Sequence, residues 1–225
     1  MGRQRAQVHG SRLVWWIVGD EGQSVAQLLP TRLTLSALKE AASGCRACDL
    51  WEKGTQTVFG EGPAQARVVM VGEQPGDQED HVGRPFVGPA GQVLDQALEA
   101  AGVDRSLVYV TNVVKHFKWT PRGKRRLHQR PDREEVSACL PWFEAEVSAV
   151  KPNVIVCLGA TAAQALLGSG FRVTRQRGQV IASTLGAPIM ATVHPSSILR
   201  APDEPSRQLA LEHFIADLRH IREYL

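Results

Sequence analysis

The chain has 225 residues and is 43% hydrophobic, which is sufficient for one globular domain with its own core. Its 26 Lys and Arg residues barely exceed its 23 Asp and Glu residues, so the charge permits a nucleic-acid partner without indicating one. Residues 13–18 are the most apolar early stretch, but they are too few to cross a bilayer and no small-residue cleavage site follows them. We therefore expect a cytoplasmic protein with neither a signal peptide nor a membrane anchor.

Residues 1–32 show no clear periodicity, and we treat them as an N-terminal extension without an assigned role, followed by one domain over 33–225. Within that domain, stretches with apolar residues at helical spacing alternate with short, continuous apolar runs that are typical of buried strands. In chain order we predict a helix over 34–42, a strand over 68–71, a helix over 93–101, a strand over 108–110, a helix over 132–147, a strand over 154–157, a helix over 161–167, short strands at 180–181 and 189–193, and a last helix over 209–221.

Strands that alternate with helices favour a mainly parallel sheet covered on both faces, that is, a single three-layer α/β/α domain. In such sheets the ligand site lies beyond the carboxyl ends of the strands, where the connecting loops meet. Three polar loops follow predicted strands, at 72–76, 112–128 and 194–196. We therefore expect the functional site at this edge of the sheet.

The first of these loops carries Glu73 and Gln74, and Gly72, Pro75 and Gly76 restrict its conformation. A plain turn is the simpler interpretation, but the meeting of three polar loops favours a site. The sequence contains neither a Walker A motif nor GxGxxG, so phosphate-loop enzymes and dinucleotide oxidoreductases lack support.

Four cysteines in a cytoplasmic protein point to metal ligands or to buried thiols rather than to disulfides. Cys45 and Cys48 form a CxxC pair that can bind one metal or cluster, and a redox role is less favoured because the pair follows a predicted helix. Cys157 lies inside a predicted core strand and is expected to be a small buried hydrophobe. Cys139 and His116 remain as further candidate ligands, although a lone histidine is more often structural.

A dense group of basic residues lies between the second strand and the following helix, and we expect it to form a mobile loop. Such a loop suits DNA phosphates, although a solvated run of charge is the alternative. His128 lies within it, and its neutral imidazole can serve as an acid, a base or a nucleophile. Composition alone does not choose among these roles. The basic residues are Arg122, Lys124, Arg125, Arg126, Arg130 and Arg133.

Five sequence blocks in order closely resemble the UdgX branch of the uracil-DNA glycosylases, which is near the cluster-bearing family 4. The resemblance runs from about residue 35 to the last helix, and the only departure in the diagnostic KRRLH block is Leu127 where Ile is common. The blocks are GEQPGD at 72–77, GRPFVG at 83–88, TNVVKH at 111–116, KRRLH at 124–128 and HPSS at 194–197.

This resemblance implies the uracil-DNA glycosylase fold, with uracil-containing DNA as the partner of a monomer, and it implies roles for individual residues. Phe86 would stack on a flipped-out uracil, and the Asn112 amide would bind its polar edge and help to exclude cytosine. His194 would stabilise the negative charge that develops on uracil, and Ser196 would hold a flanking phosphate. Gly72 and Asp77 would complete the substrate-binding loop, and Lys124, Arg125 and Arg126 would contact the DNA backbone.

The resemblance also implies a 4Fe-4S cluster bound by Cys45, Cys48, His116 and Cys139, with His116 in place of a family 4 cysteine. Cys157 would remain unligated, as its place in a strand also indicates. Zinc accepts the same kinds of ligand, so ligand chemistry alone does not decide the metal.

The same resemblance implies an unusual end to the reaction. Gln74 occupies the position where related enzymes carry an acid that orients water, and a neutral amide is no base. His128 would instead attack C1′ of the sugar and stay bonded to it, while Glu73 would orient His128 or accept its proton. The alternatives are a family 4 enzyme with ordinary turnover in which His128 only shields the site, a non-catalytic reader of uracil in DNA, and a cluster-based redox sensor.

Overall fold

The computed structural model describes residues 24–225, so the apolar run at 13–18 and most of the predicted extension lie outside the described residues. The end of that extension belongs to the packed domain. Helix α1 (Val25–Leu28) contacts helix α6 (Arg133–Val150), and Val25 is buried in the core. The packed body therefore begins before residue 33.

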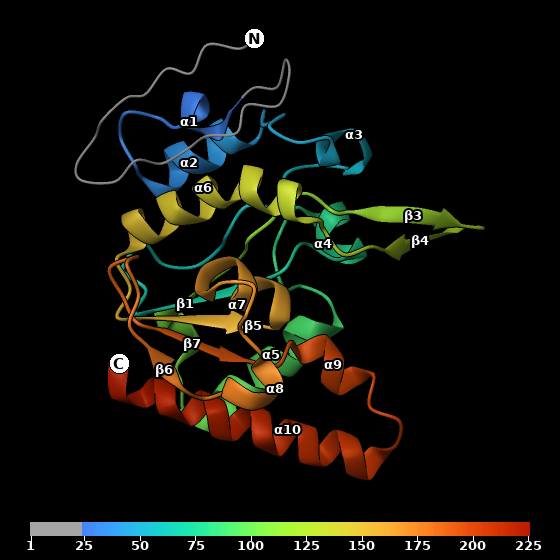
Figure 1. The fold of residues 1–225 in the computed structure, drawn as a ribbon, viewed down its shortest axis with the longest axis vertical. Helices are drawn as coiled ribbons and strands as arrows, with labels where there is room; N and C mark the ends of the chain where they lie inside the picture. The colour runs from blue at the N-terminus through green and yellow to red at the C-terminus, as the bar shows by residue number, and fades with distance from the viewer. Residues whose placement is uncertain (1–23) are drawn as a thin grey trace.

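A five-stranded sheet forms the centre of the molecule (Figure 1). Its strands run in the order β2-β1-β5-β7-β6; β6 pairs antiparallel with β7, whereas the other neighbouring strands pair parallel. The sheet is therefore mainly parallel, as the sequence predicts. The strands are β1 (Val68–Gly72), β2 (Val108–Asn112), β5 (Val154–Leu158), β6 (Val180–Ile181) and β7 (Ile189–Thr192).

Helices cover both faces of this sheet and give the predicted three layers (Figure 1). Because side chains alternate along a strand, Val69 and Val71 of β1 enter one core while Val68 and Met70 enter the other. The first core lies under α1, α2 (Leu35–Ala42), α6 and α7 (Ala160–Leu167), and the second lies under α5 (Pro89–Ala101) and α10 (Glu204–Arg219).

Side-chain caps mark the starts of two predicted helices. Thr34 accepts a hydrogen bond from the Ala37 amide at the start of α2, and Asp132 and Glu135 form a capping box at the start of α6. Helix α10 begins five residues earlier than predicted, because Asp203 caps it by accepting from the Ser206 amide. The remaining short elements are α3 (Leu50–Lys53), α4 (Asp77–Val82), η1 (Arg105–Leu107), α8 (Val173–Gln176), α9 (Pro195–Leu199) and η2 (His220–Tyr224).

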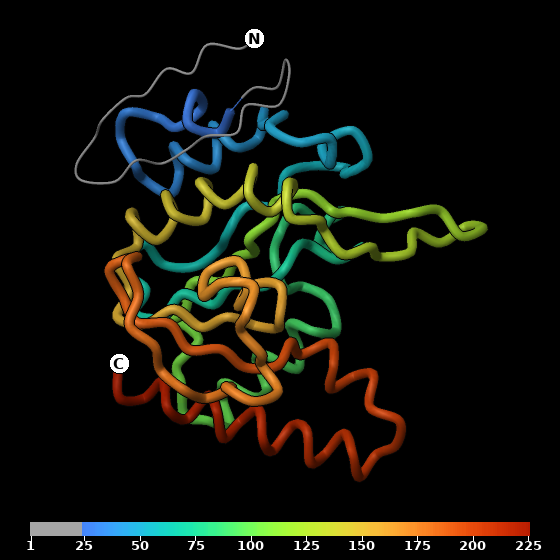
Figure 2. Tube along the Cα trace, viewed as in Figure 1, coloured from blue at the N-terminus to red at the C-terminus, as the bar shows by residue number. Residues whose placement is uncertain are grey.

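The basic segment forms a β-hairpin rather than the irregular loop that we expected. Strands β3 (Trp119–Arg122) and β4 (Arg125–His128) pair antiparallel around a two-residue turn. Gly123 begins that turn with φ of 59°, a left-handed conformation that glycine adopts without a steric penalty. The hairpin projects from the side of the domain (Figure 2).

Among residues 24–225, none of the helices has the length and apolar character needed to cross a membrane.

Candidate active site

The loops beyond the carboxyl ends of the strands surround a cavity of about 690 Å³. Seven of the predicted site residues line it: Glu73, Gln74, Phe86, Asn112, His128, His194 and Ser196. Sequence reasoning assigned no site role to four further polar residues of the lining, which are Glu79, Thr161, Ser197 and Arg200. The predicted substrate or DNA residues outside the lining are Gly72, Asp77, Lys124, Arg125 and Arg126.

Gly72 lies directly beneath the proposed base-binding residues. A Cβ atom at this position would come within 2.4 Å of Asn112 Oδ1 and 2.9 Å of Phe86 Cζ, so only glycine allows both side chains to approach the end of β1. Phe86 itself has φ of 56°, which is uncommon for a bulky residue and indicates local strain. Its ring stacks against that of His194, with centroids 6.1 Å apart and planes 28° apart. The rings of Phe86 and His194 therefore form one wall of the cavity, and the backbone conformation at Phe86 directs its ring there.

The Asn112 side chain is buried, and within the described residues its amide makes no hydrogen bond. Its backbone is held from behind, because Lys115 Nζ donates to the Asn112 carbonyl at 2.7 Å and to Glu146 Oε2 at 2.5 Å. Lys115 and Glu146 are both fully buried, and each charge offsets the cost of removing the other from water. The amide is therefore fixed in place and available to a ligand in the cavity.

His194 is poised to donate a hydrogen bond into the cavity. Its Nδ1 accepts from the Ser196 amide at 3.2 Å and lies 2.8 Å from Ser196 Oγ, so the ring proton of the neutral form belongs on Nε2. Burial, followed by the positive charge of Arg200 and of His128, lowers the pKa of His194 to about 4. The ring is therefore neutral near pH 7. Ser196 orients this histidine, a contact that the predicted phosphate role did not include.

Glu73 and His128 face each other across the cavity. Glu73 Oε1 lies 3.6 Å from His128 Nε2, slightly beyond hydrogen-bonding distance, and Glu73 Oε2 accepts a hydrogen bond from the Thr161 hydroxyl. The His128 side chain is half exposed and its ring lies 5.9 Å from that of Phe117. A carboxylate at this distance can stabilise positive charge on the imidazole, so the predicted pair is brought together.

Gln74 holds the base of the hairpin. Its Nε2 donates to the carbonyls of Lys118 and Gln129 at 3.2 and 3.0 Å, and its Oε1 accepts from the Lys118 amide at 3.1 Å. Lys118 and Gln129 flank the two strands of the hairpin, so one buried amide joins both of its ends. With its amide committed in this way, Gln74 is poorly placed to orient a water molecule.

The Arg126 guanidinium is engaged within the protein, and its contact with the DNA backbone stays a prediction. Its Nε donates to Asp77 Oδ1 at 2.5 Å and its Nη1 to Asp80 Oδ2 at 2.6 Å, which ties β4 to helix α4. Its guanidinium also lies over the rings of Phe117 and Trp119, at 5.3 and 5.5 Å from their centroids. Asp77, predicted in the substrate-binding loop, is likewise engaged by the hairpin. These contacts join the strand that carries His128 to helix α4.

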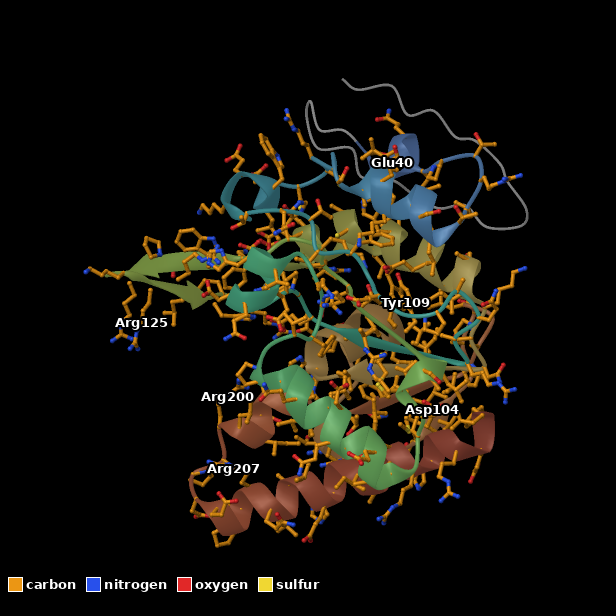
Figure 3. All side chains as sticks on the ribbon, turned by 180° about the vertical axis from the view of Figure 1, so that it is seen from behind. Glu40, Asp104, Tyr109, Arg125, Arg200 and Arg207 are labelled. Carbon is orange, nitrogen blue, oxygen red and sulfur yellow. The ribbon has the colours of Figure 1, made fainter. Side chains whose placement is uncertain are left out.

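The exposed cations lie at the tip of the hairpin. Lys124 and Arg125 are exposed, and within the described residues their side chains make no hydrogen bond or ion pair. Arg125 points away from the hairpin, on the same edge of the molecule as Arg200 and Arg207 (Figure 3). These cations suit the phosphate contacts that the resemblance implies.

The predicted metal ligands come together only in part. Cys45, Cys48 and Cys139 lie close enough that charge on the first two raises the pKa of Cys139, although burial is the larger cause and brings it to about 12. Cys139 accepts from the Lys115 amide at 3.2 Å and Cys45 from Trp142 Nε1 at 3.3 Å.

His116 lines a second cavity together with Cys45, but its Nε2 lies 2.9 Å from the Thr57 hydroxyl. In the described part of the chain, no three His, Cys, Asp or Glu side chains converge closely enough to hold one metal ion. N–H groups that donate to sulfur, as the Trp142 indole does to Cys45 and the Lys115 amide does to Cys139, are typical of cluster ligands. The residues are thus compatible with a bulky cluster and fit a single ion poorly.

Comparison with known proteins identifies the class to which this fold and site belong. The model of the uracil DNA glycosylase superfamily matches residues 59–219, a range that includes the whole lining of the cavity. The chain therefore belongs to the uracil-DNA glycosylase superfamily.

Within this superfamily, the chain is similar to several type-4 uracil-DNA glycosylases. The chain is 38% identical over 179 residues to the type-4 uracil-DNA glycosylase of Thermotoga maritima, which covers 79% of this chain and 90% of the relative. It is also 38% identical over 177 residues to the type-4 uracil-DNA glycosylase of Pyrobaculum aerophilum, which covers 76% of this chain and 87% of that protein.

Proposed function

We propose that this protein removes uracil from DNA and then remains covalently attached to the abasic site through His128, as the resemblance to the UdgX branch implies. The observation that carries this proposal is the position of His128. Strand β4 brings its imidazole to the cavity that Phe86, Asn112 and His194 line, 3.6 Å from the carboxylate of Glu73. The superfamily and the type-4 relatives support excision of uracil, and the position of the His128 imidazole supports its attachment to C1′ of the abasic site.

The reaction assigns a role to each residue of the cavity. Asn112 would bind the polar edge of a flipped-out uracil against the ring of Phe86. As the bond between N1 of uracil and C1′ breaks, its electron pair leaves with the base, and the Nε2 proton of neutral His194 stabilises the resulting anion. The lone pair of the unprotonated nitrogen of His128 then bonds to C1′. The alkylated ring loses its remaining N–H proton through Glu73, and the uracil anion finally gains one proton.

Ordinary turnover is the second candidate, because the relatives are named type-4 enzymes. That reaction requires a water molecule activated beside C1′. The engagement of Gln74 with the hairpin base removes the side chain that would orient such a water, and His128 occupies part of the cavity. Both observations favour capture over hydrolysis.

A denaturing gel distinguishes the candidates. Wild-type protein mixed with uracil-containing DNA should release one uracil per enzyme and migrate with the DNA after heating in detergent, because a carbon–nitrogen bond survives unfolding. The His128→Ser variant should still excise uracil, since its pocket is intact and water gains access to C1′, but it should form no adduct. Repeated turnover by the wild-type protein without an adduct would establish the second candidate instead.

We further propose that Cys45, Cys48, His116 and Cys139 hold a 4Fe-4S cluster. The N–H groups that donate to the sulfur atoms of Cys45 and Cys139 support this proposal, because such bonds are typical of cluster ligands. When bound, the cluster would supply charge and a rigid cross-link between the loop at 45–48 and α6. Anaerobically purified protein should be brown with about four irons per chain, and Cys157→Ala should not change that content. One zinc per chain in a colourless protein would exclude the cluster.

A further inference from the structure

Thr161 carries a buried hydroxyl that the roles assigned above do not use. It is the second residue of α7 and its side chain is largely buried. A threonine in the first turn of a helix commonly bonds to nearby backbone. Here the hydroxyl instead donates to Oε2 of Glu73, a residue 88 positions away in the loop after β1.

This contact sets the direction of the Glu73 carboxylate. The side chain of Glu73 is partly exposed, so without a partner its carboxylate could rotate toward solvent. With Oε2 held by Thr161, the second oxygen is directed to the hairpin, where it lies 3.6 Å from His128 Nε2. One hydroxyl therefore selects the orientation in which Glu73 faces the imidazole.

A purely structural link between the β1 loop and α7 is the competing explanation. Other bonds already hold both segments, however. The Glu73 carbonyl accepts from the Val114 amide at 3.0 Å, and the Gly159 amide, at the start of α7, donates to the Thr192 carbonyl at 2.9 Å. With the backbones fixed by these bonds, the hydroxyl of Thr161 acts mainly on the side chain of Glu73.

We propose that Thr161 is a positioning residue for the reaction, which aims the carboxylate of Glu73 at His128 so that it stabilises and deprotonates the alkylated imidazole. The inference rests on the proposed function, in which Glu73 and His128 act at C1′. Thr161 of α7, Glu73 of the loop after β1 and His128 of β4 then act as a chain of three side chains.

Two substitutions of Thr161 separate positioning from packing. Thr161→Val keeps the shape of the side chain and removes the hydroxyl, whereas Thr161→Ser keeps the hydroxyl. Loss of a hydrogen bond to a charged group should slow adduct formation under single-turnover conditions on the order of tenfold in Thr161→Val. Thr161→Ser should react at nearly the wild-type rate, and both variants should bind uracil-containing DNA as tightly as the wild type.

A second pair of variants tests whether the effect passes through Glu73. In a Glu73→Ala background, Thr161→Val should add no further slowing, because the carboxylate that it positions is absent. Thr192→Val is the matched control, since the buried Thr192 hydroxyl donates to Asp217 outside the cavity lining. It should lower the melting temperature without slowing the reaction.

The inference is overturned if Thr161→Val reacts at the wild-type rate, if Thr161→Ser is equally slow, if the full slowing persists without Glu73, or if Thr192→Val is slowed as much. Uracil release and adduct are measured in the same samples. Failure of the wild type to form an adduct would refute capture by His128 and, with it, this role of Thr161. An adduct that Thr161→Val forms as fast as the wild type would refute the role of Thr161 alone.

Discussion

The α/β body and the β3–β4 hairpin contribute to the site in different ways. The body supplies side chains from short loops at the rim of a buried parallel sheet, and these form the cavity around Phe86, Asn112 and His194. The hairpin has two strands and little buried surface, and side chains of the body hold it through Gln74, Asp77 and Asp80. In the proposed reaction, recognition and bond cleavage would therefore belong to the body, whereas the hairpin would add the residue for capture.

This division predicts that the hairpin can be detached without disabling the pocket. Arg126→Ala leaves the fully buried Asp80 without its cation, and breaking such a pair costs about 3 kcal/mol. The hairpin should then leave α4 and withdraw His128, so that adduct formation is lost while uracil release continues. Adduct and released uracil are measured together, and continued release of uracil is the control that the body remains folded. Full adduct formation by Arg126→Ala would contradict the anchoring role.

The converse change in the body should remove both products. Asn112→Ala deletes the buried amide that would bind uracil, at a cost on the order of 1 to 3 kcal/mol in the transition state, or a slowing of roughly 5- to 150-fold. Because capture follows cleavage, adduct formation should slow by the same factor as uracil release. Unchanged excision in a single-turnover assay would mean that the uracil pocket lies elsewhere.

Adjacent arginines of the hairpin should respond differently to salt. Arg125 is exposed at the tip, so Arg125→Ala should weaken DNA binding modestly and reduce the slope of log affinity against log salt by about 0.9 for one lost phosphate contact. The adduct should still form at low salt. Arg219→Ala, at the far end of α10, is the matched control for loss of one exposed charge. Equal salt slopes for Arg125→Ala and the wild type would remove Arg125 from the DNA contact.

The smallest expected effect concerns the protonation of His194. Because burial lowers the pKa of His194 to about 4, its ring should stay neutral between about pH 5 and 8, whereas an ordinary histidine gains its proton near pH 6.5. A nitrogen-15 NMR titration of the histidine rings should therefore find the His194 midpoint well below that of an exposed histidine. A midpoint near 6.5 would mean that His194 is charged during part of the working range.

The two regions also differ in how well the sequence predicts them. The body was predictable because its strands are buried on both faces and read as continuous apolar runs, and because Asp132 and Glu135 mark the start of α6 locally. The loops around the cavity could also be predicted, because each of them follows the end of a predicted strand. Local patterns therefore sufficed for the sheet, for one helix start and for most of the cavity.

The hairpin was not predictable in this way. Its strands carry charged residues and Pro121, which are typical of a loop, and its partners Asp77 and Asp80 lie more than 40 residues earlier in the chain. Arg125 and Arg126 are identical in type, and only the alternation of side chains along a strand sends one outward and the other to α4. The contact of Thr161 with Glu73 was missed for a similar reason. The strand order of the sheet brings α7 beside β1, and the local sequence of neither segment predicts that order.

Mass spectrometry of the digested adduct tests the central claim most directly. After nuclease and trypsin treatment, the deoxyribose phosphate remnant should lie on the peptide at 127–133, which extends past Arg130 because trypsin does not cleave before Pro131. Fragmentation should place the added mass on His128, the only histidine of that peptide. A remnant on another residue, or a heat-stable adduct formed by His128→Ser, would contradict the assignment of His128 as the nucleophile.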